Sequence, residues 1–225
     1  MATWTNEPVC VLIAGAGGHG QVVADILLAE DAAGRGLRPI GFVDDNASLT
    51  GKIVLGLPIL GTIADCATIA HDAVILAIGD NAMRARQFLQ LQQNGEQFTT
   101  TRHPSAILAR QVAIGMGTVV CAGAIVNPGA TIGCNAILNS GCIVEHHCVI
   151  GDHVHIAPGV RMGGEVVVGE GTLVGIGSIV LPGARIGAGC VIGGGAVVTA
   201  DVADNSVMIG VPARFIRNTP PMWQM

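Results

Sequence analysis

Aromatic and charged residues are scarce in this sequence. Only 3% of its 225 residues are aromatic, none is tyrosine, and 12% are charged. The core therefore cannot depend on a few large rings and must contain many small aliphatic side chains. The formal net charge is −5, so we expect no basic face for nucleic acid. Nucleotides are still possible ligands, because backbone N–H groups and one or two cations can hold phosphates.

Long apolar runs are also missing, although the mean hydropathy is +0.59. Glycine and polar residues interrupt every stretch before the ~20 residues that a spanning helix needs, so we expect no membrane insertion. The first residues, MATWTNE, lack the cationic start and the apolar core of a signal peptide. Seven cysteines without a C-x-x-C pair favour reduced thiols over a disulfide framework. The sequence therefore predicts a cytoplasmic protein.

What the sequence does have is 33 glycines and an unbroken period of six. From Ala106 to Asp201 it divides into sixteen hexads with a small or β-branched first residue and an apolar third residue. An α-helix does not produce this period, whereas one short strand followed by a turn does. Three such strands close a triangular coil of about 18 residues, and stacked coils pair their backbones ~4.8 Å apart. This part is predicted to be an all-β parallel β-helix.

The segment before the hexads has the pattern of an α/β unit. The apolar run Val9–Ala14 predicts a buried parallel strand, and residues 40–43 and 73–78 predict two more. Residues 21–30 and 82–93 have helical periodicity. A glycine-rich loop joins the first strand to the first helix, as in half of a Rossmann domain. We divide the chain into a nucleotide-binding domain, residues 1–102, and a β-helix domain with a C-terminal cap, residues 103–225.

The glycine-rich loop leaves three interpretations open. Gly15, Gly17 and Gly20 match the dinucleotide pattern G-x-G-x-x-G, and Asp44 follows at roughly the distance of a ribose ligand. NAD is one candidate, but a domain that ends near residue 100 is too short for two mononucleotide halves. A single nucleotide, such as the UDP or GDP of a nucleotide sugar, fits better. Glycines that merely pack a turn are the third alternative.

Six segments carry a resemblance to a known family: GAGGHG, FVDD, AIGDN, HPSA, NSGCIVEHHCVIGDHVHIAPG and GVPAR. With the hexads, they make the chain similar to bacterial nucleotide-sugar acetyltransferases, including those of bacillosamine synthesis, and to sialic acid O-acetyltransferases. The resemblance implies a left-handed β-helix, acetyl-CoA as co-substrate and a homotrimer with active sites between subunits. It also implies that the nucleotide sugar contacts Gly17, Gly18, His19, Asp44, Asp45, Gly79 and Asn139.

Four of the seven histidines fall within ten residues: His146, His147, His153 and His155. Acetyl transfer needs a base for the proton of the nucleophile, and histidine has a suitable pKa near neutral pH. It also needs a donor for the thioester oxygen as that oxygen becomes negative. Gly164 lies one full coil after His146, where it would leave space for a substrate and expose an N–H. It is our candidate for that donor.

The same spacing places Ile176 and Gly194 in one column, where they would frame a groove for a pantetheine arm. The resemblance implies that acetyl-CoA contacts both of these residues and His155, and that His146 is the base. Arg214, in the closing segment GVPAR, is either a phosphate partner or simply an exposed arginine of the cap.

The sequence departs from the family at His147, where an acidic residue usually orients the base. A neutral imidazole can hold the tautomer of His146 but adds no negative charge. Glu145 or Asp152 could substitute. A solvated histidine patch and a metal site, as in carbonic anhydrases with the same helix, are the alternatives. Because His147 and His153 are one hexad apart, they belong to different faces, so we expect no metal.

Cys142, Cys148 and Cys190 occupy first hexad positions and are predicted to be core residues, not nucleophiles. The sequence as a whole predicts an acetyl-CoA-dependent N-acetyltransferase acting on a nucleotide-linked amino-deoxysugar. An amine needs less help from a base than a hydroxyl does, so the absence of an acid beside His146 favours the amine. The alternatives are a sugar O-acetyltransferase and a nucleotide-sugar-binding scaffold without turnover.

Overall fold

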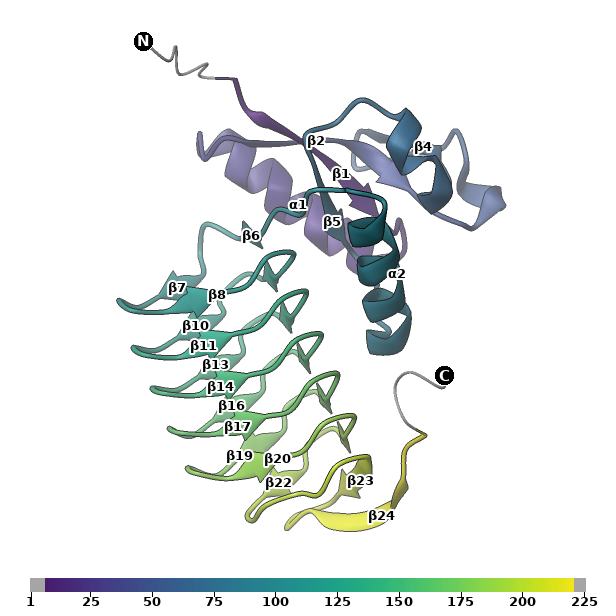
Figure 1. Ribbon diagram of the computed structural model, residues 1–225. Helices are drawn as coiled ribbons and strands as arrows, with labels where there is room; N and C mark the ends of the chain where they lie inside the picture. Colours follow the sequence, from purple (N-terminus) through teal and green to yellow (C-terminus); the bar gives the residue numbers. More distant parts are fainter. Residues whose placement is uncertain (1–6, 221–225) are drawn as a thin grey trace.

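The computed structural model describes residues 7–220 and contains two domains joined end to end (Figure 1). The first residues, from which we expected no signal peptide, lie outside the described range. The N-terminal domain is a five-stranded sheet in the order β3-β4-β2-β1-β5. Its elements are β1 (Val9–Ala14), α1 (Gly18–Ala32), β2 (Leu37–Val43), η1 (Ala47–Leu49), β3 (Ile53–Val54), β4 (Leu57–Gly61), η2 (Ile63–Thr68), β5 (Ala73–Leu76) and α2 (Asn81–Gln93).

The three predicted strands and two predicted helices are confirmed. Strand β1 lies inside the sheet and pairs in parallel with β2 and β5, and its last four residues are buried. Strand β4 extends the sheet in parallel, while β3 pairs with it as a short antiparallel edge. This edge was not predicted from the sequence, because a very short strand has too little alternation to be recognised.

The β-helix has one short strand in each hexad, at its second and third positions. The strands are β7 (Ile107–Leu108), β8 (Ala113–Ile114), β9 (Val119–Val120), β10 (Ile125–Val126), β11 (Thr131–Ile132), β12 (Ile137–Leu138), β13 (Ile143–Val144), β14 (Val149–Ile150), β15 (His155–Ile156), β16 (Arg161–Met162), β17 (Val167–Val168), β18 (Leu173–Val174), β19 (Ile179–Val180), β20 (Arg185–Ile186), β21 (Val191–Ile192) and β22 (Val197–Val198). Strand β6 (Thr101–Arg102) precedes the first hexad and pairs with β9.

The prism has three faces, and each face is one sheet in which the strands of successive coils pair in parallel (Figure 1). The first face runs from β7 to β22, the second from β8 to β20, and the third from β6 through β21 to β23 (Ser206–Ile209) and β24 (Arg214–Asn218). Residues three hexads apart pair with each other, as Ile125, Ile143 and Arg161 do on the first face. The predicted coil of three hexads is confirmed. Strand β24 turns back antiparallel on β23 and forms the predicted cap.

Small aliphatic residues fill the interior of the prism. The third-position residues Val144, Ile150 and Ile156 are at most 2% exposed, and the first-position cysteines Cys142 and Cys148 are fully buried. Burial raises the pKa of the Cys142 thiol to about 12, so that thiol stays protonated and unreactive at neutral pH. The prediction that these cysteines, with Cys190, belong to the core is confirmed.

The two domains share buried surface. Val119 and Cys121 of the β-helix belong to the same apolar cluster as residues of β1 and α1. At the end of α1, the buried Glu30 accepts a hydrogen bond of 2.5 Å from the hydroxyl of Thr101 in β6, the strand that pairs with β9 of the β-helix. The N-terminal domain is therefore packed onto the β-helix and not tethered to it by a free linker.

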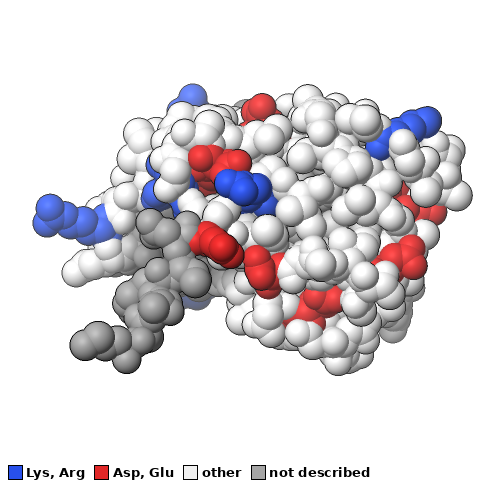
Figure 2. All heavy atoms as spheres, turned by 90° about the horizontal axis from the view of Figure 1, so that it is seen from above, with Lys and Arg blue, Asp and Glu red and all other residues white. Residues whose placement is uncertain are grey.

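Charged side chains are sparse on the end that carries the N-terminal domain. Lys and Arg are scattered there, several of them beside acidic residues (Figure 2).

In residues 7–220, no helix is both long and apolar enough to cross a bilayer.

Candidate active site

The loop between β1 and α1 requires glycine for steric reasons. Gly15 has a φ of +113°, and a Cβ there would lie 2.8 Å from the carbonyl oxygen of Ala77. A Cβ on Gly20 would collide with the carbonyl of Gly15. Gly17, the N-cap of α1, contributes no side-chain cap to the first turn of the helix. The first-turn N–H groups therefore remain available to an anion, at the positive end of the helix dipole.

A cavity of about 400 Å³ opens at this helix end. It is lined by Gly15, Gly17, Gly18, His19, Asp44, Asp45, Ile63, Ala77, Ile78, Gly79 and Met83. The structure thus brings together all the predicted nucleotide-sugar residues except Asn139. Sequence reasoning missed four ordinary apolar residues without any distinguishing pattern: Ile63 of η2, Ala77 and Ile78 just after β5, and Met83 of α2.

The two aspartates of this cavity differ in their hydrogen bonds. Asp44 accepts from the backbone N–H of Ala16 through Oδ2, at 2.7 Å, and from that of Asn46 through Oδ1, at 2.8 Å. Asp44 therefore holds the glycine loop in place. Asp45 accepts from the N–H of Ile63 through Oδ1, at 3.0 Å, and its Oδ2 has no partner among the described residues. Asp45 is the carboxylate with more capacity left for a ligand.

His19 connects this cavity to the third face of the β-helix. Its ring lies 6.3 Å from that of His155, centroid to centroid. Asn139 donates its amide to Nε2 of His155 at 3.0 Å, which places the proton of neutral His155 on Nδ1. Asn139 is thus a neighbour of His155 and does not line the cavity. Nε2 of His19 is buried and has no partner among the described residues.

Both of these imidazoles are neutral at pH 7. Burial, and secondarily the charge of Arg84, lowers the pKa of His19 to about 4. Burial also lowers the pKa of His155 to about 4, again assisted by Arg84 and by His19, while a backbone hydrogen bond to Gly79 opposes the shift. Neutral rings can accept as well as donate, which suits recognition of polar ligand groups.

His146 and His147 form a pair on the turn from the first to the second face. Both are exposed, and their Nδ1 atoms are 3.1 Å apart with the rings nearly perpendicular. One Nδ1 must donate and the other accept. If Nδ1–H of His146 donates, Nε2 of His146 is unprotonated and can act as a base. His147, in the left-handed region at φ +57°, is then the acceptor that fixes this tautomer.

Gly164 accommodates the ring of His146. A Cβ on Gly164 would lie 2.5 Å from Nε2 of His146 and closer still to Cε1. The expectation that this glycine leaves space for a substrate is therefore wrong in detail, since the imidazole occupies that space. The N–H of Gly164 has no acceptor within residues 7–220. Proline occupies the same hexad position at Pro128, Pro158 and Pro182, so the coil does not need this N–H.

Neither acid considered as a partner of His146 contacts its ring. Glu145 accepts from the backbone N–H of His146 at 3.4 Å, and Asp152 accepts from that of Cys134 at 2.7 Å. No set of three or more His, Cys, Asp or Glu residues in the described chain is arranged to hold a metal. The ring partner of His146 is His147.

The predicted acetyl-CoA residues lie along the third face and its turn to the first face. The side chain of Ile176 is 63% exposed, and its Cγ2 lies 3.0 Å from where a Cβ of Gly194 would be. The two residues are stacked, as the length of the coil predicted. Arg214, in β24, is exposed and donates to the carbonyl of Ala213 at 3.1 Å.

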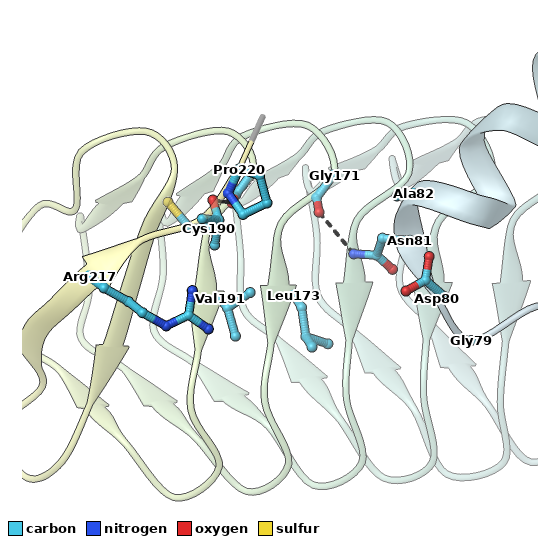
Figure 3. A pocket seen from close by; sticks show the side chains of 12 residues that line it. Gly79, Asp80, Asn81, Ala82, Gly171, Leu173, Cys190, Val191, Arg217 and Pro220 are labelled. Carbon is cyan, nitrogen blue, oxygen red and sulfur yellow. Dashed lines mark hydrogen bonds between the residues drawn. The ribbon is translucent and has the colours of Figure 1, made fainter. Parts of the chain in front are cut away.

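A second cavity, of about 270 Å³, lies on the third face below the N-terminal domain (Figure 3). Leu173 and Val191 form its floor, with Asp80 and Asn81 on one side and Arg217 on the other. Sequence reasoning missed this cavity. Leu173 and Val191 pair in register below His155 at outward-facing second hexad positions, and apolar residues there are the signal that could have revealed it.

Within one chain, the structure does not bring His146 to the nucleotide cavity. The cavity adjoins the third face through His19 and His155, whereas His146 lies on the turn between the other two faces. These two groups of predicted site residues therefore lie at different edges of the prism.

Two family models match the chain. Residues 10–91 match the PglD N-terminal domain, and residues 129–164 and 165–200 match the bacterial transferase hexapeptide repeats. A curated relative, UDP-N-acetylbacillosamine N-acetyltransferase of Bacillus subtilis (strain 168), is 35% identical over 116 residues. That match covers 50% of this chain and 51% of the relative, so it spans about half the length of each.

Solved structures match over nearly the full length. The acetyltransferase domain of PglB from Neisseria gonorrhoeae FA1090, in complex with acetyl coenzyme A, is 30% identical with a TM-score of 0.87. The match covers 93% of this chain and 100% of that one. A mutant of perosamine N-acetyltransferase from Caulobacter crescentus, with CoA and GDP-perosamine, is 34% identical with a TM-score of 0.85, over 92% of this chain and 97% of that one. The β-helix is accordingly of the left-handed, hexapeptide-repeat type.

Proposed function

The chain belongs to the hexapeptide-repeat sugar acetyltransferases with a PglD-type N-terminal domain, and we propose that it acetylates the amino group of a nucleotide-linked amino-deoxysugar, with acetyl-CoA as donor. The observation that carries this proposal is the pairing of His146 with His147 over Gly164. It places a base, Nε2 of His146, beside the backbone N–H of Gly164, which has no acceptor within residues 7–220. Two of the relatives named above, UDP-N-acetylbacillosamine N-acetyltransferase and perosamine N-acetyltransferase, are N-acetyltransferases named for amino sugars, and the second is bound to GDP-perosamine.

The proposed reaction is a direct transfer. The sugar amine attacks the thioester carbonyl carbon of acetyl-CoA, while Nε2 of His146 removes a proton from the amine. The carbonyl oxygen becomes negative and accepts a hydrogen bond from the N–H of Gly164. The C–S bond then breaks as the tetrahedral intermediate collapses, and the CoA thiolate takes the proton from His146. The products are the acetamido sugar and free CoA.

His147 has a positioning role in this scheme. It accepts from Nδ1–H of His146 and so keeps Nε2 unprotonated before the reaction. An imidazole lacks the negative charge that a carboxylate would contribute once His146 becomes positive. This is a weaker arrangement, and it suits an amine acceptor better than a hydroxyl.

The nucleotide binds in the cavity at the end of α1. The first-turn N–H groups of Gly18 and His19 hold phosphate, and the free carboxylate oxygen of Asp45 accepts a hydrogen bond from the nucleotide. Gly17 and Gly79 allow the nucleotide to approach the backbone closely, since the space that a Cβ would occupy at either position is open. His19 and Asn139 contact the sugar where the cavity meets the third face.

Acetyl-CoA binds along the third face and its turn to the first. His155 contacts the acetyl end of the molecule. Ile176 and Gly194 contact the pantetheine arm, and Arg214 contacts a phosphate. The apolar floor formed by Leu173 and Val191 continues this surface.

We place the complete site between two copies of the chain in a homotrimer. One copy supplies His146, and its neighbour supplies the nucleotide cavity and His155. The support for this is that the two groups lie at different edges of one prism. The seven unpaired thiols fit a cytoplasmic location.

Two measurements test the proposal. A thermal-shift screen of UDP- and GDP-linked amino sugars should identify ligands that raise Tm, because a ligand that binds only the folded state stabilises it. Release of free thiol from acetyl-CoA should then depend on an amino-sugar acceptor. A response only to hydroxyl acceptors would make the protein an O-acetyltransferase. Binding without any acceptor-dependent consumption of acetyl-CoA would make it a scaffold.

A further inference from the structure

The edge between the second and third faces carries a column of backbone carbonyls. Asn135, His153, Gly171 and Gly189 follow one another at intervals of one coil and end successive turns of the β-helix. Their N–H groups bond along the column, but none of their carbonyl oxygens accepts from a backbone N–H within residues 7–220. Carbonyl oxygens without a backbone donor need another hydrogen-bond donor wherever the N-terminal domain covers this edge and excludes water.

One buried arginine supplies donors to two of these carbonyls. Arg84 of α2 is 0% exposed, and its guanidinium donates from Nε to the oxygen of Asn135 at 3.1 Å and from Nη2 to that of His153 at 2.8 Å. Asn135 returns a bond from its side-chain amide to the carbonyl of Arg84. The guanidinium therefore spans two adjacent coils.

The same guanidinium holds the loop that follows β5. Nη1 donates to the oxygen of Ile78 at 3.0 Å and, over 3.5 Å, to that of Gly79, while Nη2 also donates to Oδ1 of Asn81 at 2.9 Å. Asn81 in turn donates to the carbonyl of Gly171, the next in the column, at 2.9 Å (Figure 3). The loop of residues 78–81 is thus fixed to three successive coils through Arg84 and Asn81.

This loop forms part of the candidate active site on both of its sides. Ile78 and Gly79 line the nucleotide cavity, and Gly79 and Asn81 line the cavity on the third face. Small movements of the loop relative to the β-helix would therefore alter both cavities at once.

The described part of the chain provides no ion pair for the charge of Arg84. Its described hydrogen-bond acceptors are all neutral oxygens. Burial lowers the pKa of Arg84 to about 10, against the opposing effect of Asp80, so the guanidinium remains protonated at neutral pH. Burying a cation is costly unless its donors are matched, and here the planar fork of Arg is matched from both domains.

We propose that Arg84 is a positioning residue of the nucleotide site, which fixes the loop of residues 78–81 to two coils of the β-helix and so sets the wall of the nucleotide cavity. The effect on the nucleotide rests on the proposed function, whereas the fixing of the loop does not. The residue acts through the loop and touches no reactant itself.

The test compares Arg84→Met and Arg84→Lys with Thr101→Val in the full-length protein. Thr101→Val removes a hydrogen bond to Glu30 of α1, at a contact that involves neither Arg84 nor residues 78–81, and leaves the loop untouched. Amide hydrogen exchange of residues 79–81 is measured for each variant, with the affinity for UDP and for GDP by calorimetry. We expect Arg84→Met to speed exchange in the loop by roughly tenfold or more, while Thr101→Val changes it by less than about twofold.

Arg84→Met should also weaken nucleotide binding and raise KM for the nucleotide sugar, with a smaller rise in KM for acetyl-CoA, because the loop reaches the acetyl-CoA surface only at the cavity on the third face. Arg84→Lys should be intermediate, because one ammonium cannot reach both coils and the loop. Unchanged loop exchange in folded Arg84→Met would overturn the proposal. A change in loop exchange and in nucleotide affinity no larger than that caused by Thr101→Val would overturn it as well. If Arg84→Met does not fold, Asn81→Ala must show the same loop-specific change. A wild-type protein that binds neither UDP nor GDP would contradict the proposed function instead, and loop exchange would still decide the role of Arg84.

Discussion

At the scale of single residues, the side chain of the proposed base, His146, has a second imidazole as its ring partner. Nδ1 of His147 faces Nδ1 of His146 at 3.1 Å, and both acids close in sequence are bound to backbone N–H groups. The pair can fix a tautomer but cannot neutralise an imidazolium. The chemistry proposed for this site therefore depends on His146 far more than on its partner.

Replacing His146 tests this directly. His146→Ala should lower kcat by roughly 10²–10⁴-fold, because general-base catalysis contributes about that much, and should leave acetyl-CoA affinity nearly unchanged. Steady-state kinetics and acetyl-CoA calorimetry measure the two quantities. Wild-type kcat in this variant would remove His146 as the base and direct attention to His153 and His155.

His147 should behave differently. His147→Ala should cost less than His146→Ala, and His147→Asp or His147→Glu should raise kcat by placing a charge beside the imidazolium. The left-handed backbone at this position favours Asp over Glu. Kinetics of the three variants give the order, and equal losses in all three would show that His147 does not orient the base.

The buried histidines predict a dependence of stability on pH. The pKa values of His19, His153 and His155 are each lowered to about 4 in the folded protein, mainly by burial and then by Arg84. Because the unfolded chain takes up protons near pH 6.5 and the folded chain does not, the contribution to stability is fully present above pH 6.5 and declines as the pH falls towards 4. Urea unfolding at pH 7.5, 6 and 5 should show this decline.

His153→Asn is the matched variant for that experiment. Asparagine tolerates the left-handed φ of +59° at this position and does not titrate. The variant should lose stability less steeply between pH 6.5 and 4.5 than the wild type does. A free energy of unfolding that is flat with pH in the wild type would contradict the buried, neutral state of these rings.

At the scale of elements, the turn that carries Gly164 packs against the ring of His146, which belongs to the turn one coil earlier. Gly164→Ala would place a methyl group against the ring of His146 at a position whose backbone any residue can adopt. We expect a loss of about 1–3 kcal/mol in unfolding free energy from overpacking, and a fall in kcat as the ring is displaced.

A double-mutant cycle isolates this contact. In the His146→Ala background, Gly164→Ala should cost little, because the ring it would strike is absent. Chemical denaturation of the two single variants and the double variant gives the coupling. Additive losses would mean that Gly164 and His146 do not pack as the structure has them.

The repeating elements could be predicted from sequence and the contacts between non-repeating ones could not. The unbroken hexads determine the length of the coil, because the backbone ladder fixes each residue above its counterpart. That is why the stacking of Ile176 on Gly194 was predictable. The same spacing placed Gly164 beside His146 but could not reveal which group fills the space. Arg84 lies in an ordinary helical sequence, and only the docking of α2 on the prism edge gives it partners.

At the scale of the whole molecule, one chain holds the predicted site residues in two separate places. If neighbouring chains complete each other, co-expressed His146→Ala and Asp45→Arg chains should form mixed trimers with activity. Each variant alone lacks either the base or an open nucleotide cavity. With random mixing, about a quarter of wild-type activity is expected, since one interface in each mixed trimer pairs two intact halves.

The two variants purified separately and assayed together without subunit exchange serve as the control. Mixed trimers without activity, from variants that fold and assemble, would place the whole site within a single chain.

The register of three hexads per coil also limits how the length of this protein can change. His155 on β15 and the cap strand β23 are three pairings apart on the third face, or about 14 Å at ~4.8 Å per step. Gain or loss of a full coil lengthens or shortens the distance between His155 and β23 by one step, while every side chain stays on the same face of the prism. An insertion of any other length within the ladder must loop out or rotate the rest of the prism. Evolution can therefore change the length of the proposed acetyl-CoA surface only in discrete increments of one coil.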